Sequence, residues 1–146
     1  MMEIYNYLIL LLVLMIASNF DILNDMTVPI PLGVFGMVIR TALIIFADRN
    51  NAKECIIFAV ILGVIFFIGA ITGAYGGADI FYASMTGLYL GISGVFAVMI
   101  GSLISLPYAV YIKKTKENKT FPYIPFLFIG TLIMFGVYMI KGMFEI

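Results

Sequence analysis

The chain has 146 residues, of which 64% are hydrophobic and only 11% are charged. Its formal net charge is zero and its mean hydropathy is +1.16, whereas soluble domains carry about 25% charged residues to keep a polar surface. This composition excludes an ordinary soluble domain and predicts an integral membrane protein. The balanced charge gives no indication of nucleic-acid binding. A single cysteine, Cys55, and the lack of histidine exclude an internal disulfide, a four-cysteine zinc site and histidine-based catalysis.

The charged residues are clustered, and the apolar runs between the clusters have about the length of a helix that crosses a ~30 Å hydrocarbon core. We therefore expect one all-α domain over residues 1–146, a bundle of about six transmembrane helices. The first run carries Glu3 where a signal peptide has a basic start, and no small-residue cleavage site follows, so we expect it to remain as a span. The expected spans are 4–20, 31–47, 55–74, 80–92, 95–112 and 123–140.

The division between the fourth and fifth spans is the least obvious of these boundaries. The stretch 80–112 contains no charged residue, and as one helix it would be about 50 Å long. A normal bilayer does not accommodate such a helix even when it tilts. Ser93 and Gly94 form the weakest helical point near the middle of the stretch, so we divide it there. Five spans are the alternative if the stretch is not divided.

The lysines predict an orientation. Half of the eight basic residues lie in the loop between the last two spans, namely Lys113, Lys114, Lys116 and Lys119. By the positive-inside tendency this loop is cytoplasmic, and six spans then put both termini outside. Because two spans separate Asp21 from Asp79, both aspartates lie on the same side of the membrane, which this orientation makes the cytoplasmic side.

Asp21 and Asp79 each lie at the end of an apolar run. Ionisable groups at such depth are costly and usually functional. Two adjacent carboxylates cannot both ionise easily, so they share a proton and can act as base toward water and as acid toward a leaving amine. Each aspartate is also compatible with an interfacial residue or a helix N-cap. Asp25 competes with Asp21 for the role of partner.

Three segments, in chain order, carry a resemblance to a known family. Asp21 is followed by a loop that contains Pro29, the stretch 76–91 has the sequence GGADIFYASMTGLYLG, and the stretch 121–130 has the sequence FPYIPFLFIG. Together they resemble the type IV prepilin peptidases, which include the archaeal preflagellin peptidases and are membrane aspartyl proteases of the GxGD type. Ala78 stands where the strict motif has its second glycine.

The resemblance implies an aspartic endopeptidase that removes the short basic leader of prepilin-like or preflagellin-like proteins on the cytoplasmic side of the cell membrane. Asp21 and Asp79 would be the catalytic pair that activates water. The residues that it assigns to substrate approach are Gly76, Gly77, Ala78 and Pro125. It implies no metal and no organic cofactor, and its partners are the protein substrate and membrane lipid. It leaves the particular substrate and the oligomeric state open.

Two other classes of protein compete with this hypothesis. Arg40 lies inside the second expected span, where it could pair with an acid or a substrate group, or snorkel along a tilted helix. A small transporter or channel subunit would place such charges in its bundle and would require Asp79 to face a path across the membrane. A non-catalytic scaffold would use both aspartates as caps, which predicts that they lie far apart. A peptidase predicts that they approach to within about one bridging water.

Overall fold

The computed structural model describes residues 2–23, 28–46, 51–73, 75–115 and 122–144. The described part of the chain is all-helical, as expected from the sequence. Its helices are α1 (Met2–Leu23), α2 (Ile30–Phe46), α3 (Ala52–Ile71), α4 (Gly77–Leu90), α5 (Ile92–Thr115) and α6 (Ile124–Phe144). The stretch 80–112 is divided into two helices, which confirms a six-helix bundle over five. Asp25, Lys116 and Lys119 lie outside the described residues.

Four helices, α1, α3, α5 and α6, are long and apolar enough to cross a membrane. The outward faces of these helices are apolar; in α3 only Cys55, Ala59, Leu62 and Phe66 are buried inside the protein. α2 is apolar but has only 17 residues. Such a surface would be unfavourable in water and suits a hydrocarbon environment. The fold therefore has the character of a membrane helix bundle.

α4 is the central helix of the bundle. It has 14 residues, about 21 Å of helix, and it contacts each of the other five helices. All eight residues from Tyr82 to Tyr89 are buried. The close approach of α3 depends on Gly87, where a Cβ atom would lie 2.8 Å from the backbone of Phe58 and Ala59. A short helix enclosed on all sides places its two ends inside the protein, where they can carry buried polar groups.

The break between α4 and α5 lies at Gly91, two to three residues before the predicted position at Ser93 and Gly94. Gly91 has φ +56° and ψ −129°, a backbone conformation that residues with a Cβ atom rarely adopt. Its N–H donates to Gly87 O at 2.8 Å. Gly94 instead serves packing, because a Cβ atom there would lie 2.6 Å from Thr86 O. The predicted division of the stretch 80–112 is confirmed, but the helix break lies at Gly91 and not at Gly94.

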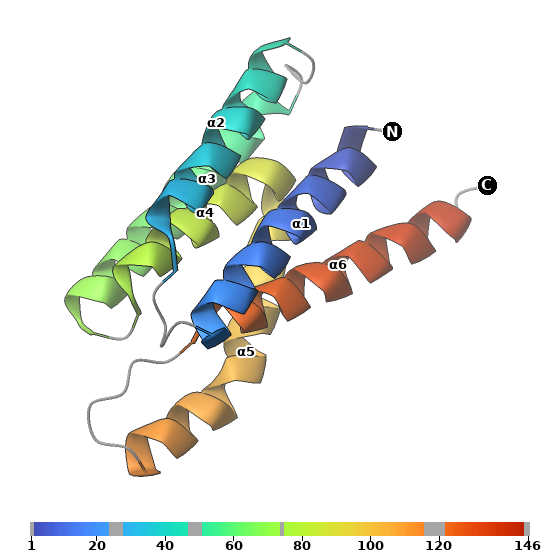
Figure 1. Cartoon of the computed structure of the whole chain (residues 1–146). Helices are drawn as coiled ribbons and strands as arrows, with labels where there is room; N and C mark the ends of the chain where they lie inside the picture. The colour runs from blue at the N-terminus through green and yellow to red at the C-terminus, as the bar shows by residue number, and fades with distance from the viewer. Residues whose placement is uncertain (1, 24–27, 47–50, 74, 116–121, 145–146) are drawn as a thin grey trace.

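The bundle has two ends, which Figure 1 shows with the chain coloured from blue to red. At one end α1 finishes, α4 begins and α6 begins; we call it the aspartate end because Asp21 and Asp79 lie there. At the other end lie the two chain termini, the beginning of α3 and the junction of α4 with α5. We call it the arginine end, after Arg40 of α2.

Candidate functional site

Asp21 lies in the last turn of α1 and is 4% exposed. A carboxylate at this position is unfavourable for α1 itself, because the C-terminal end of a helix carries partial negative charge. It is favourable for α6, whose first residue, Ile124, donates its backbone N–H to Asp21 Oδ2 at 3.3 Å. This interaction joins residues that are 103 positions apart. Asp21 thus caps α6, and α6 in turn holds the carboxylate in place.

Asp79 is the third residue of α4 and is 6% exposed. Its Oδ2 accepts a hydrogen bond from the N–H of Gly76 at 2.9 Å, and its own N–H donates to Gly76 O at 3.1 Å. This reciprocal pair closes the first turn of α4 and satisfies a backbone donor that the helix itself cannot use. Negative charge is also favourable at the N-terminal end of a helix. Asp79 therefore has a capping role as well.

Asp21 and Asp79 interact electrostatically across the aspartate end. Asp79 precedes the predicted span 80–92, and burial raises its pKa to about 7. The hydrogen bond from Gly76 lowers this pKa, and the neighbouring Asp21 raises it further. Both aspartates act as caps, as the scaffold hypothesis expects. That hypothesis also predicts that they lie far apart, whereas Asp21 is close enough to raise the pKa of Asp79. A group whose pKa is near neutrality can both give and take a proton at physiological pH.

The residues predicted for substrate approach lie in different environments. Gly76 and Gly77 are exposed; a Cβ atom at Gly76 would meet only Asp79 Oδ2, at 3.5 Å, and one at Gly77 would meet nothing within 4 Å. Open space therefore adjoins the backbone beside Asp79. Ala78 instead packs against the main hydrophobic core. Pro125 is the second residue of α6 and is half-buried, immediately after the N–H that binds Asp21.

Two buried tyrosines that we did not single out from the sequence flank the pair. Tyr82 lies one turn after Asp79, interacts electrostatically with Asp21, and donates its hydroxyl to Pro29 O at 3.1 Å. Tyr123 interacts electrostatically with Asp79, and its hydroxyl lies 3.1 Å from Ser102 Oγ. The i, i+3 spacing from Asp79 was a usable signal for Tyr82. Nothing in the local sequence distinguished Tyr123 from an ordinary core aromatic residue.

An aromatic cluster extends the wall beside Asp79. The ring of Tyr75, which directly precedes Gly76, lies 4.4 Å from that of Phe66 and 5.2 Å from that of Tyr123, measured between centroids. Phe66 and Tyr123 are themselves 5.2 Å apart. Such rings supply a large apolar surface at low conformational entropy. The carboxyl groups are therefore set against an apolar wall on one side and the exposed glycine backbone on the other.

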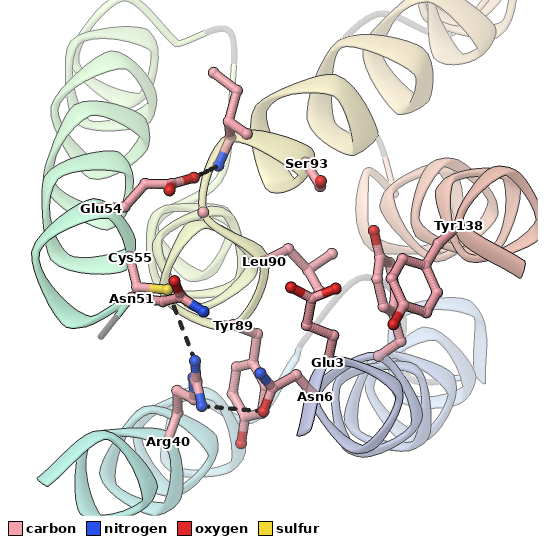
Figure 2. Close-up of a pocket in the computed structure, with 13 residues that line it drawn as sticks. Glu3, Asn6, Arg40, Asn51, Glu54, Cys55, Tyr89, Leu90, Ser93 and Tyr138 are labelled. Atoms are coloured by element: carbon pink, nitrogen blue, oxygen red, sulfur yellow. Dashed lines mark hydrogen bonds between the residues drawn. The ribbon is translucent and has the colours of Figure 1, made fainter. Parts of the chain in front are cut away.

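The arginine end holds the other buried charge. Arg40, in α2, is 1% exposed. Its Nε donates to Leu88 O at 3.1 Å, its Nη1 to Asn6 Oδ1 at 3.0 Å and its Nη2 to Cys55 Sγ at 3.7 Å, two of which Figure 2 marks. Leu88 O is one of the last carbonyls of α4, which have no intrahelical partner. Arg40 thus caps α4 and joins α1, α2, α3 and α4, so that it is directed into the bundle rather than snorkelling.

The chemistry open to the aspartate end is acid–base catalysis by paired carboxyl groups. Within the described residues, no group of three or more His, Cys, Asp and Glu side chains could hold a metal ion. Comparison of the chain with protein-family models, with curated proteins and with solved structures finds no match. The resemblance to the prepilin peptidases thus rests on the motifs of the sequence alone.

Proposed function

We propose that the protein is a membrane aspartyl endopeptidase of the GxGD type that removes the short leader of prepilin-like or preflagellin-like proteins. The observation that carries the proposal is the meeting of Asp21 and Asp79. These two acids are 58 positions apart in the chain, both are almost fully buried, and Asp21 is close enough to raise the pKa of Asp79. Like charges that are buried together are unfavourable for stability, so their pairing calls for a functional reason.

The surroundings of the pair support the same reaction. Burial raises the pKa of both carboxyl groups, to about 6 for Asp21 and to about 7 for Asp79, which favours a state in which Asp21 is ionised and Asp79 is protonated. Asp21 accepts a proton from a water molecule while that water attacks the scissile carbonyl carbon, and Asp79 donates its proton to the carbonyl oxygen. Collapse of the tetrahedral intermediate breaks the C–N bond: Asp21 passes the proton it took from water to the leaving amine, and Asp79 recovers a proton from the hydroxyl group as the carbonyl re-forms. Neither a metal nor an organic cofactor enters this scheme.

The proposed substrate segment is an extended peptide that precedes a hydrophobic helix. An extended strand needs a neighbouring backbone that it can approach closely, and Gly76 and Gly77 provide exposed backbone with no packed side chain above it. Ala78 does not contribute a side chain to this approach, because it packs into the core. The substrate's apolar segment would continue along the outward apolar faces of the bundle.

We also propose that the six helices form one multi-pass domain in the cell membrane, with the aspartate end on the cytoplasmic side. The lysines near the end of α5 favour this orientation, and Lys114 is exposed there. The leader of a substrate made in the cytoplasm would then reach the Asp21–Asp79 pair without crossing the bilayer.

The transporter hypothesis receives less support. It requires Asp79 to face a polar path across the membrane, and the cavity beside Arg40 is lined by neither Asp79 nor Asp21. The two polar regions lie at opposite ends of α4, with the buried segment from Tyr82 to Tyr89 between them.

The test is cleavage of a tagged prepilin-like protein co-expressed with the wild-type chain or with Asp79→Asn or Asp21→Asn. We expect the wild type to trim the leader and each single substitution to abolish trimming while the protein still accumulates in the membrane. Lys53→Gln, which also changes one charge but at the exposed beginning of α3, is the control that should retain cleavage.

The other outcomes are equally informative. If Asp79→Asn abolishes cleavage and Asp21→Asn does not, the partner role passes to Asp25. If the wild type leaves a panel of such substrates intact under conditions in which a known prepilin peptidase cuts them, the proposed function is wrong.

A further inference from the structure

The arginine end contains a cavity of about 180 Å³ that lies between the beginnings of α1 and α3, the α4–α5 junction and the end of α6 (Figure 2). This volume is large enough for several water molecules or for one small polar ligand. The lining side chains that matter here are Glu3, Asn6, Arg40, Glu54, Tyr89 and Tyr138. None of them belongs to the proposed peptidase site, so the cavity calls for its own explanation.

The positive and negative side chains of this cavity lie at different depths. Arg40 is almost fully buried at its inner side, whereas Glu3 and Glu54 are exposed at its rim. One oxygen of Glu54, Oε1, accepts the backbone N–H of Ile92 at 3.0 Å and so caps α5. Glu3 lies in the first turn of α1 and lines the cavity close to Asn6 and Tyr138 in Figure 2. The cavity is therefore positive inside and negative at its mouth.

The spacing between these charges follows from the geometry of α1. Glu3 and Asn6 are three residues apart, so they lie on the same face of the helix about one turn, or roughly 5 Å, from each other. Asn6 Oδ1 accepts a hydrogen bond from Arg40 Nη1 at 3.0 Å. The acidic position at the mouth thus lies about one helical turn from the polar contact that fixes the guanidinium group.

Aromatic rings line the same space. Arg40 lies 5.8 Å from the centre of the Tyr89 ring, and the rings of Tyr7 and Tyr138 lie 5.4 Å apart beside Glu3. The face of an aromatic ring attracts an ammonium group. A carboxylate together with tyrosine rings is a suitable environment for a small cation at the mouth of the cavity.

We propose that this cavity binds a zwitterion in which a primary ammonium group and a phosphate are joined by a two-carbon chain, the chemistry of ethanolamine phosphate. The phosphate enters toward Arg40, and the ammonium group remains at the mouth with Glu3 and Tyr138. A bare anion would meet the two carboxylates at the rim, and a bare cation would meet Arg40. The ligand is either a free molecule or the headgroup of a phospholipid, and the two sources share this chemistry.

The first experiment measures the melting temperature of the full-length protein in detergent with ethanolamine phosphate, glycerol phosphate or choline phosphate. We expect ethanolamine phosphate to raise the melting temperature in a saturable manner. Glycerol phosphate lacks the ammonium group, and choline phosphate has no N–H to donate to Glu3, so both should give clearly smaller shifts. Equal shifts for all three compounds would overturn the proposal.

A second arm identifies the source of the ligand. The protein is placed in nanodiscs of phosphatidylcholine with and without phosphatidylethanolamine, and its melting temperature is compared. Stabilisation by the lipid alone assigns the cavity to a headgroup, and stabilisation by the soluble compound alone assigns it to a free ligand. If neither the soluble compound nor the lipid stabilises the protein, the proposal is wrong.

Variants connect the effect to the cavity. Glu3→Gln should weaken binding of whichever compound or lipid stabilises the protein by at least about tenfold. Because Glu3 is exposed, the substitution should leave folding intact. Arg40→Gln should weaken the same binding. If Arg40→Gln does not fold, the result for Glu3→Gln alone tests the proposal. Lys114→Gln, near the end of α5, is the control that should bind as the wild type does. Unchanged binding by Glu3→Gln would contradict the proposal, and none of these measurements depends on peptidase activity.

Discussion

The buried charged side chains at the two ends of α4 have different surroundings. Each end carries a charge that complements the helix dipole, with Asp79 at its beginning and Arg40 beside its last carbonyls. The difference lies in the neighbours: Asp79 interacts electrostatically with a second carboxyl group, Asp21, whereas Arg40 donates to a backbone carbonyl, an amide oxygen and a thiol. The first arrangement costs stability and offers chemistry, and the second contributes stability. Stability measurements can therefore separate a site from a structural support.

The largest effect that distinguishes the ends is on catalysis. Asp79→Asn and Asp21→Asn should each lower leader cleavage by about 10²–10⁴-fold or more, because each removes an acid–base group. Neither substitution should lower the melting temperature much, because an Asn amide oxygen can still accept the backbone N–H of Gly76 or Ile124 and carries no charge that must be buried. Cleavage rates and melting curves of purified protein test both statements. A strong loss of stability in either variant would show that the aspartates serve the fold as caps first.

Arg40→Met should have the opposite profile, with a loss of about 3–5 kcal/mol in the free energy of unfolding. The substitution keeps an unbranched side chain but leaves Leu88 O and Asn6 Oδ1 without this buried donor, and each such group costs about 1–3 kcal/mol. Lys114→Met, on an exposed part of α5, is the matched control and should change little. If Arg40→Met melts as the wild type does, the arginine end does not support the fold in the way described.

The pH dependence of stability should originate at the aspartate end. The pKa of Asp79 is about 7 in the folded protein and near its ordinary value of about 3.9 in the unfolded chain. Between these values the folded state holds a proton that the unfolded state releases, so the free energy of unfolding should fall as pH rises from about 4 to about 7, by about 2–4 kcal/mol. Burial also raises the pKa of Asp21, to about 6, so Asp79→Asn should reduce the change in melting temperature over this window without abolishing it, and Asp21→Asn combined with Asp79→Asn should flatten it. A profile unchanged in the double variant would assign the dependence to another group.

Substitutions at two glycines of α4 should have the smallest effects, and they test packing and substrate approach separately. Gly87→Ala should destabilise the protein by about 1–3 kcal/mol, because the added methyl group meets the backbone of α3 at 2.8 Å. Gly77→Ala should be nearly neutral for stability, because its Cβ atom meets nothing within 4 Å. It should nevertheless raise the KM for a leader peptide, because the methyl group stands beside the proposed approach to Asp79. A neutral Gly77→Ala in both assays would move substrate approach elsewhere.

Much of the fold was predictable because apolar runs and charge clusters are local features of a membrane sequence. Hydropathy located all six helices, and helix length required a division of the stretch 80–112. The boundaries were less accurate: α1 continues to Leu23 and so includes Asp21, and the α4–α5 break falls at Gly91. The central position of α4 was not predictable, because its contacts with the five other helices depend on tertiary packing.

The candidate site divides in the same way. Counting helices was enough to predict that Asp21 and Asp79 share one end of the bundle. It could not predict that the N–H of Ile124 binds Asp21, since that contact joins residues 103 positions apart. The direction of Arg40 also stayed open at the level of sequence, because Arg40 and its neighbour Thr41 are the only polar side chains of α2, and two adjacent residues do not define a polar face.

The short length of α4 has a consequence for biogenesis. About 21 Å of helix with an acid in its first turn and buried hydroxyl groups along its length is a poor substrate for independent insertion into a bilayer. α3, by contrast, is one of the most apolar helices of the chain and packs extensively on α4. We therefore expect α4 to leave the translocation machinery only together with α3, as a helical hairpin. A chain truncated between Leu90 and Ile92 would lack α5 and α6, which pack against α4. We expect membrane quality-control proteases to degrade this truncated chain faster than the full-length protein.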